Sequence, residues 1–441
     1  MKIPLLDLKA QYQSIKTDID AAIKKVVDAQ DFILGEEVKQ FEKETAEYCG
    51  TKYGVGVASG TDALILALKA LNIGPGDEVI TTPFTFFATA ESISIVGAKP
   101  VFVDIEPKAY NIDPSLIEAQ ITKKTKVIIP VHLYGQCADM DPIIAVAKKH
   151  GLKIIEDNAQ AIGATYKGRK SGSMGDIGAL SFFPSKNLGG FGDGGMAVTN
   201  DEKLAARIKS LRVHGSSIRY IHSEIGMNSR LDSLQAAVLR VKLQYLNKWI
   251  EGRKSIAEFY NSKLRGLPII CPNAQSYNIH TYHQYTLRVK SDKEKLMKHL
   301  LDNGIETRTY YPIPLHLQES YKSLGYKNGS MKESEMACRE AFSIPVFPEM
   351  AQAQKDYIAD KITGYFFLND SYIPFFSFIW TSSVELITKI MSKSAPALNF
   401  DIFSNKLPIP HLNLLNIFLF LCRGKEIKSF KIIFTAGFSA L

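Results

Sequence analysis

The sequence predicts an α/β fold in which strands and helices alternate around a mostly parallel sheet. Short apolar segments such as 53–59, 78–83 and 153–158 alternate with segments whose apolar residues have helical spacing. This alternation builds strand–helix–strand units, whose strands run parallel. With 441 residues and 46% apolar composition, the chain is long enough for one large and one smaller domain, each with its own core.

The elements can be assigned in order along the chain. Residues 11–50 carry apolar residues at helical spacing and predict two surface helices. The next hundred residues predict strands at 53–59, 78–83, 99–105, 127–133 and 153–158, with helices at 61–71, 85–96, 114–119 and 142–150. A long helix over about 231–264 then leads into a smaller α+β domain. We therefore expect a large domain at 1–245, a small domain at 246–367 and a separate tail at 368–441.

Composition excludes several classes of protein. The formal charge of +8 is spread along the chain without a long basic block, which argues against a nucleic-acid partner. The cysteines are odd in number and far apart, so they predict neither a disulfide framework nor a metal site. The first residues lack the apolar segment of a secretory signal, so we expect a cytoplasmic protein that does not associate with membranes.

The tail at 368–441 differs in composition from the rest of the chain. Twelve of the 24 phenylalanines lie between Phe366 and Leu441, yet no stretch there has the roughly 18 uninterrupted apolar residues of a spanning helix. We interpret the tail as a read-through or frame-changed extension. The alternative is an appendage that binds a membrane surface.

The segment 181–195, SFFPSKNLGGFGDGG, is the first candidate for chemistry. It presents Lys186 from irregular backbone between a serine–aromatic–aromatic–proline sequence and five glycines. Glycines allow positive φ and a close approach of backbone to a ligand, which suits a lysine placed beneath a flat cofactor. The alternative is a glycine-rich surface turn with a solvated lysine.

Further candidates follow the ends of other predicted strands. Asp157 ends the apolar segment KIIED, and a buried carboxylate there needs a cationic partner. The segment SGTDAL at 59–64 begins a helix, whose free N–H groups and dipole favour a phosphate. Phe84 or Phe86 could stack on a planar ring, with Gln160 on its other face. Each has a structural alternative, namely a strand-end aspartate, a helix cap or a core aromatic.

Together these residues match what pyridoxal phosphate requires of a protein. The cofactor needs a lysine for its aldehyde, a carboxylate for its ring nitrogen, a phosphate site and side chains against the ring. The runs SGTDAL, TTPFTF, IIEDNAQAIGA, SFFPSKNLGGFGDGG and GMNSRLDSLQAAVL resemble the DegT/StrS-type sugar-nucleotide aminotransferases. The resemblance covers residues 3–365 and implies fold type I, with a mostly parallel seven-stranded sheet flanked by helices.

The resemblance implies roles around the cofactor ring. Lys186 would bond the aldehyde and move a proton between substrate and cofactor, Asp157 would pair with the ring nitrogen, and Gln160 would pack on the ring. Gly60, Thr61 and Ser181 would hold the phosphate.

The resemblance also implies a homodimer with shared active sites. Asn228 would contact the phosphate of the neighbouring subunit. The alternative for Asn228 is a cap of the helix that begins near Leu231.

The resemblance finally implies the reaction. Relatives with histidine in place of Lys186 dehydrate the sugar, so the lysine favours amination, with L-glutamate as donor and a nucleotide-diphosphate keto-sugar as acceptor. NSRLD favours amination at C3 of a UDP- or dTDP-3-oxo sugar for surface polysaccharide, with Arg230, Arg308, Tyr311 and His316 as candidate substrate contacts. The alternatives are a 4-keto sugar aminotransferase and a non-catalytic regulatory protein with the same fold.

Overall fold

The computed structural model describes residues 1–368. The predicted tail falls outside these residues except for its first position, Leu368, which ends a helix.

A seven-stranded sheet forms the centre of the larger part of the fold. Its strand order is β1-β9-β8-β5-β4-β2-β3. Every neighbouring pair from β8 to β3 is parallel, whereas β9 is antiparallel to both β8 and β1. This confirms the predicted, mostly parallel seven-stranded sheet. The strands are β1 (Tyr53–Val57), β2 (Glu78–Thr81), β3 (Lys99–Phe102), β4 (Thr125–Ile128), β5 (Lys153–Asp157), β8 (Ile177–Ser181) and β9 (Gly195–Thr199).

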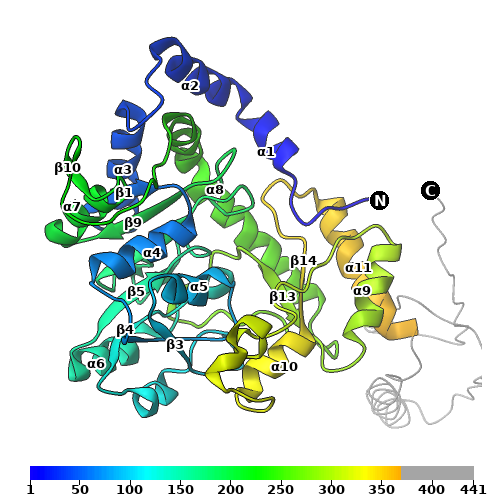
Figure 1. The fold of residues 1–441 in the computed structure, drawn as a ribbon. Helices are drawn as coiled ribbons and strands as arrows, with labels where there is room; N and C mark the ends of the chain where they lie inside the picture. The colour runs from blue at the N-terminus through cyan, green and yellow to red at the C-terminus, as the bar shows by residue number, and fades with distance from the viewer. Residues whose placement is uncertain (369–441) are drawn as a thin grey trace, which may run out of the picture. The chain divides into compact units, whose positions relative to one another are not determined.

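The sheet strands are buried on both faces because helices cover them. Val127 in β4 and Ile155 in β5 have no exposed surface, as expected for β-branched residues in a covered parallel sheet. The helices, drawn in Figure 1, are α1 (Leu8–Ser14), α2 (Lys16–Ala29), α3 (Glu36–Cys49), α4 (Gly60–Ala70), α5 (Ala88–Ile95), α6 (Met140–His150), α7 (Glu202–Leu211), α8 (Ser233–Lys263), α9 (Lys293–Asp302), α10 (Lys332–Glu340) and α11 (Gln352–Leu368).

Two helix predictions were wrong in detail. The amino-terminal region contains three helices rather than two, because the chain leaves helical geometry at Ile15, whose side chain is buried against Val238 and Trp249. The predicted helix at 114–119 is a pair of 3₁₀ turns, Pro114–Leu116 and Glu118–Gln120. A segment this short forms too few α-helical bonds to offset the cost of nucleation.

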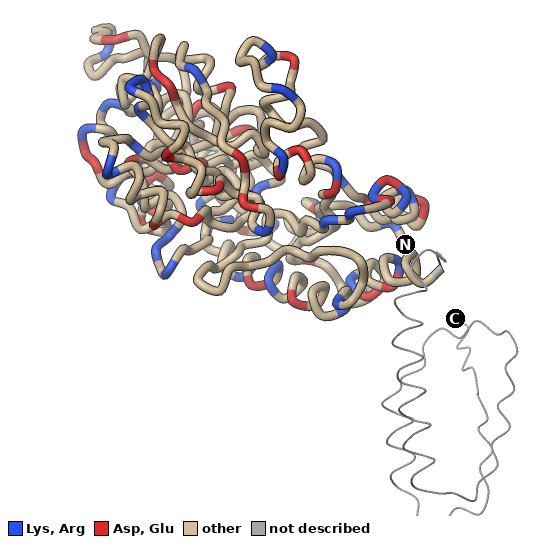
Figure 2. The backbone as a smooth tube through the Cα atoms, turned by 90° about the horizontal axis from the view of Figure 1, so that it is seen from below, with Lys and Arg blue, Asp and Glu red and all other residues tan. Residues whose placement is uncertain are grey.

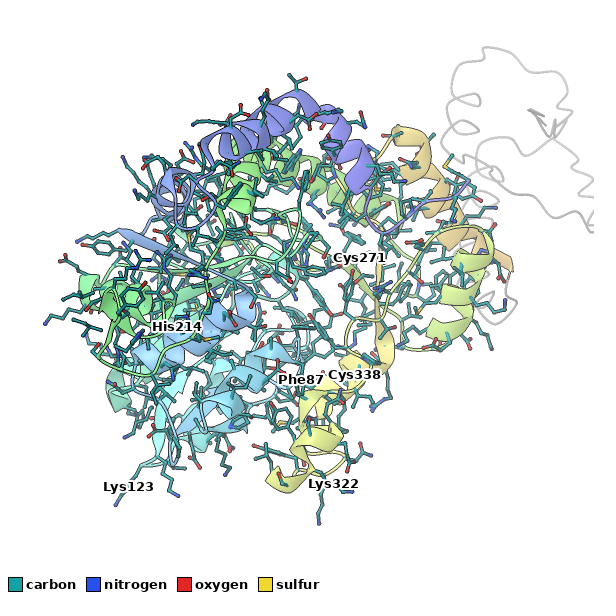
Figure 3. The ribbon with its side chains drawn as sticks, turned by 45° about the horizontal axis from the view of Figure 1, so that its top comes forward. Phe87, Lys123, His214, Cys271, Lys322 and Cys338 are labelled. Carbon is teal, nitrogen blue, oxygen red and sulfur yellow. The ribbon has the colours of Figure 1, made fainter. Side chains whose placement is uncertain are left out.

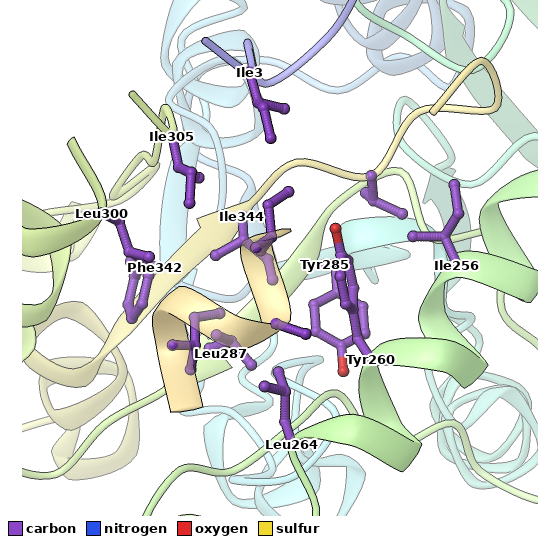
Figure 4. Close-up of a cluster of buried hydrophobic side chains, with 14 of the residues drawn as sticks. Ile3, Ile256, Tyr260, Leu264, Tyr285, Leu287, Leu300, Ile305, Phe342 and Ile344 are labelled. Carbon is purple, nitrogen blue, oxygen red and sulfur yellow. The ribbon is translucent and has the colours of Figure 1, made fainter. Parts of the chain in front are cut away.

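A second hydrophobic core lies around the carboxyl-terminal half of α8. A two-stranded antiparallel pair, β13 (Tyr285–Arg288) and β14 (Ala341–Ile344), packs there with α9 and α11. In Figure 4, Tyr260 of α8 and Tyr285 of β13 lie against each other, with ring centroids 5.1 Å apart. Since α8 contributes to both cores, the predicted domain boundary at residue 245 falls within one continuous helix.

Aromatic side chains join the segment 315–326 to the large sheet. Phe87, labelled in Figure 3, lies with its ring centroid 5.6 Å from that of Tyr321. Phe102 at the end of β3 contacts both Tyr321 and Tyr326. These contacts fix the segment 315–326, which carries His316, beside the large sheet.

The surface of the described chain carries both signs of charge. Figure 2 shows basic and acidic positions interspersed along the backbone. Within residues 1–368, no helix is both long and apolar enough to span a bilayer. The same residues contain no cluster of histidine, cysteine and acidic side chains arranged to hold a metal ion.

Candidate functional site

The candidate residues gather at one edge of the sheet. Parallel strands place their carboxyl ends together, and ligands of such sheets bind at that edge. Asp157 pairs in register with Ala179, two residues before Ser181. Ser181 in turn pairs with Gly195, which also pairs with Val57 at the end of β1. The ends of β1, β5 and β8 therefore meet at the start of β9.

The segment with Lys186 is a closed loop above this edge. Its two ends are joined where Phe182 donates its N–H to Gly194 O at 2.8 Å. Inside the loop, Gly190 donates to Phe182 O and Lys186 donates to Phe183 O, each at 2.8 Å. An added Cβ at Gly189 would overlap the carbonyl of Pro184, so the loop requires glycine at that position.

The environment of the Lys186 amine favours its neutral form, because it lowers the pKa of the amine. Burial lowers its pKa to about 8, against the opposing charge of Asp157. Among residues 1–368 the amine has no hydrogen-bond or ion-pair partner. A lysine of this kind is a nucleophile and a base near neutral pH.

Asp157 is a buried carboxylate whose charge is only partly compensated, by the more distant charge of Lys186. One oxygen accepts a hydrogen bond from the Thr89 hydroxyl at 2.8 Å, and the other accepts from the N–H of Ala159 at 3.2 Å. Its pKa is raised, chiefly by burial. It forms no ion pair within the described part of the chain. Because a buried carboxylate is costly without a cationic partner, the site fits the protonated ring nitrogen of pyridoxal phosphate.

The start of α4 provides a second fitting feature, a place for an anion. Ser59 caps the helix by accepting from Asp62 N–H at 3.1 Å. The preceding N–H groups, at Gly60 and Thr61, have no acceptor within the helix. An added Cβ at Gly60 would lie 2.7 Å from Cβ of Ser181, so glycine is needed where the two segments meet. The predicted phosphate residues thus lie together at a helix N-terminus.

Asn228 is followed by Ser229, which is hydrogen-bonded to the start of helix α4. The hydroxyl of Ser229 donates to Asp62 at 2.6 Å and accepts from Ala58 N–H at 3.1 Å. Asn228 itself is exposed, and its backbone forms an isolated antiparallel β-bridge with Val213. It does not cap α8, since Asp232 does so by accepting from Gln235 N–H.

Gln160 and Tyr311 are joined in the structure. The Gln160 amide donates to the Tyr311 hydroxyl at 2.8 Å and accepts from Tyr134 N–H at 2.9 Å. Phe84 is buried beside them, with its ring centroid 5.3 Å from that of Tyr311. By contrast, Phe86 is 62% exposed. Of the two predicted ring contacts, Phe86 therefore has the face available for a planar ligand.

The four substrate candidates occupy different environments. Arg308 is exposed and Arg230 is half-buried. Tyr311 belongs to the aromatic cluster around Phe84. His316 is buried, and its Nε2 lies 3.1 Å from Glu335. Burial lowers the pKa of His316, so this histidine is a neutral partner of Glu335.

Two residues near the site, Thr89 and His283, were missed from the sequence. Thr89 binds Asp157, and a signal was present, because Thr85 and Thr89 are four residues apart and their hydroxyls are 3.0 Å apart. His283 is buried, and its Nδ1 has no hydrogen-bond partner. Burial and the charges of Lys186 and Arg253 lower its pKa. No local pattern marks His283 as close to Lys186, from which it is separated by almost a hundred residues.

Comparisons with known proteins identify the family of this chain and proteins of similar fold. The model of the DegT/DnrJ/EryC1/StrS aminotransferase family matches residues 13–363. A pleiotropic regulatory protein from Geobacillus stearothermophilus is 50% identical over 83% of this chain and 99% of its own length. The UDP-2-acetamido-2-deoxy-3-oxo-D-glucuronate aminotransferase of Pseudomonas aeruginosa is 44% identical over 82% of this chain and its full length. The crystal structure of S. venezuelae DesV in complex with a ketimine intermediate is similar at a TM-score of 0.81, with 44% identity over 82% of this chain and 98% of that one.

Proposed function

Because this chain belongs to the DegT/DnrJ/EryC1/StrS aminotransferase family, we propose that it aminates C3 of a UDP-linked 3-oxo sugar with L-glutamate as donor. It is a pyridoxal phosphate-dependent sugar-nucleotide aminotransferase. The observation that carries the proposal is the pair formed by a lysine with a lowered pKa and a buried carboxylate that forms no ion pair within residues 1–368, Lys186 and Asp157, at the ligand-binding edge of the sheet. The Pseudomonas aeruginosa relative supports the choice of sugar.

Pyridoxal phosphate supplies an aldehyde that bonds amines and a ring that accepts electrons from the substrate carbon. Lys186 would bond the aldehyde and later, as a free amine, move a proton at that carbon. Asp157 would keep the ring nitrogen protonated. Gly60, Thr61 and Ser181 would bind the phosphate.

The remaining residues would orient the ring and the sugar. Phe86 and Gln160 would contact the two faces of the ring, the amide being held by Tyr311 and Tyr134. Exposed Arg308 and half-buried Arg230 would bind the diphosphate or a sugar carboxylate, since a guanidinium binds either in a bidentate manner. His316 would act indirectly, by fixing the segment beside Tyr311.

The direct test is an assay with purified protein, pyridoxal phosphate and L-glutamate. We expect formation of a 3-amino sugar from a UDP-3-oxo sugar, detected by mass spectrometry, and slower turnover of dTDP-4-keto sugars. Faster turnover of the 4-keto sugars would contradict C3 amination. Binding of the cofactor without turnover of any keto-sugar would favour the second candidate, a regulatory role like that named for the Geobacillus stearothermophilus relative.

The lowered pKa of Lys186 gives a prediction that needs no cofactor. The neutral amine is the reactive form, so its acylation rate should rise with pH through a midpoint of about 8. A free lysine derivative should show its midpoint near 10.4. Pulse labelling with acetic anhydride, followed by mass spectrometry of the Lys186 peptide, measures the difference. A midpoint above about 10 would contradict burial of the amine.

We also propose a homodimer in which Asn228 completes the active site of the partner subunit. The segment 216–225, which contains the hairpin of β10 (Ser216–Ile218) and β11 (Ile221–His222), precedes Asn228 and exposes large hydrophobic side chains. Their exposed fractions are 63% for Ile218, 80% for Tyr220, 60% for Ile221 and 87% for Ile225. Several large exposed hydrophobic side chains in one short segment favour an interface there.

The shared site can be tested by mixing two inactive variants, Lys186→Ala and Asn228→Ala. Random pairing makes half of the dimers mixed, and each mixed dimer has one intact site, so about a quarter of wild-type activity should return. Sedimentation before and after Ile221→Asp tests the hairpin, with Leu301→Asp on α9 as a control, because Leu301 is 63% exposed. No recovered activity on mixing would exclude a shared site.

A cytoplasmic location remains part of this proposal. Its support is chemical: Cys49, Cys137, Cys271 and Cys338 are free thiols, which persist in a reducing compartment.

A further inference from the structure

We propose that Lys242, on helix α8, is a positioning residue that holds the loop carrying Lys186. This inference rests on the proposed role of Lys186. Lys242 lies well away in sequence, is 1% exposed and is a charged residue in the interior of a long helix. Buried lysines are rare unless their charge has a partner.

Two contacts of the Lys242 amine lie in the loop that follows Lys186. Its Nζ donates to the carbonyl of Gly189 at 2.7 Å. The same amine lies 4.7 Å from the ring centroid of Phe191, in a cation–π contact. One ammonium group therefore holds two residues of the loop, three and five positions after the lysine.

A second residue of the same helix face contacts the same loop. Gln235 precedes Lys242 by seven residues, which is two helical turns, so both side chains project from one face. The Gln235 side-chain oxygen accepts from Phe191 N–H at 2.7 Å. An added Cβ at Gly190 would lie 2.8 Å from this oxygen, so the glycine allows close contact with α8.

Burial of Lys242 costs free energy, because its charged amine loses its contact with water. A methionine would fill the same volume without desolvation of a charge. The opposing charge that acts on Lys242 belongs to Glu349, whose two carboxylate oxygens are buried. Burial lowers the pKa of Lys242 to about 8, although Glu349 opposes this shift.

The loop needs such support because residues 191–193 form no backbone hydrogen bond within it. Phe182 bonds to Gly194 and to Gly190, which closes the loop on either side of these residues. Gln235 and Lys242 hold Phe191, the first of them, against a rigid helix. Catalytic geometry has to be kept within fractions of an ångström, and helices provide this better than loops do.

The experiment compares Lys242→Met with Lys248→Met, an exposed lysine on the same helix. In cofactor-free protein, hydrogen exchange of the Phe191 amide should accelerate at least tenfold in Lys242→Met and stay unchanged in Lys248→Met. The acylation midpoint of Lys186 should also rise by about half a pH unit, because a loosened loop admits water to the amine. The dissociation constant for pyridoxal phosphate, from equilibrium dialysis, should rise at least fivefold.

Two outcomes would overturn the proposed role of Lys242. Unchanged exchange at Phe191 in folded Lys242→Met would overturn it. Faster exchange with an unchanged acylation midpoint would also overturn it, since Lys242 would then be merely structural. If Lys242→Met does not fold, Gln235→Leu is measured in the same way and has to satisfy the same two criteria. The first two measurements use no cofactor, so they stand even if wild type fails to bind pyridoxal phosphate and the proposed function is wrong.

Discussion

Replacing Lys186 with alanine is expected to lower kcat by at least about a thousandfold, because it removes the group that we propose as both nucleophile and proton carrier. The variant should still bind pyridoxal phosphate through Gly60, Thr61 and Ser181, but without the visible absorbance of a lysine-bound cofactor. Added L-glutamate should bleach that absorbance in wild type and change nothing in Lys186→Ala. Turnover and absorbance spectra measure the two effects.

The control is Lys248→Ala, which removes an exposed lysine from α8 and should leave both turnover and spectrum unchanged. Visible absorbance in Lys186→Ala would mean that another amine bonds the cofactor. The buried amine of Lys242, whose pKa is also lowered to about 8, would then be the first alternative.

Asp157→Asn should give the second largest loss, about a hundredfold or more in kcat, since an amide cannot hold a proton on the ring nitrogen. The side-chain oxygen of the asparagine can still accept one of the two hydrogen bonds, from Thr89 or from Ala159. The new side chain should therefore keep the position of Asp157. Measurement of kcat and KM separates loss of chemistry from loss of binding. The control Thr89→Val removes one hydrogen bond and should have a smaller effect. Wild-type kcat in Asp157→Asn would exclude the assigned role.

Asp157→Asn should lower kcat but raise the stability of the folded protein. Burial raises the pKa of Asp157 in the folded state, so the folded protein binds this proton more tightly than the unfolded chain does. Its contribution to stability is therefore present at low pH and is lost as pH rises through the raised pKa. Cofactor-free Asp157→Asn should gain stability relative to wild type above that pH. Denaturant unfolding at several pH values checks the sign, and a constant difference would contradict it.

The sheet could be predicted because its strands are short apolar runs separated by helical patterns. β5 and α4 appear within two residues of their predicted positions, since an apolar run ends at Asp157 and a capping serine precedes Gly60. The amino-terminal helices were less predictable. Their apolar periodicity is continuous across Ile15, so the pattern does not show the break. The Ile15 side chain packs against α8, which is more than two hundred residues away.

The site was predictable only where a residue lies in a local motif. Lys186, Asp157 and Gly60 each occupy a glycine-rich loop, a strand end or a helix start. The bond between Gln160 and Tyr311 joins residues 151 positions apart, and no local pattern encodes it. The buried pairing of His316 with Glu335 is similar, because a histidine in a loop near the site reads as a ligand contact until its partner is seen.

The antiparallel direction of β9 fixes both ends of the loop that carries Lys186. Because Ser181 and Gly195 are paired, the chain leaves the sheet and returns to it at adjacent positions. The thirteen residues between them therefore start and end at one point of the sheet. A change in the conformation of this loop need not alter the registers of β8 and β9, so the strands that carry the rest of the candidate site keep their positions.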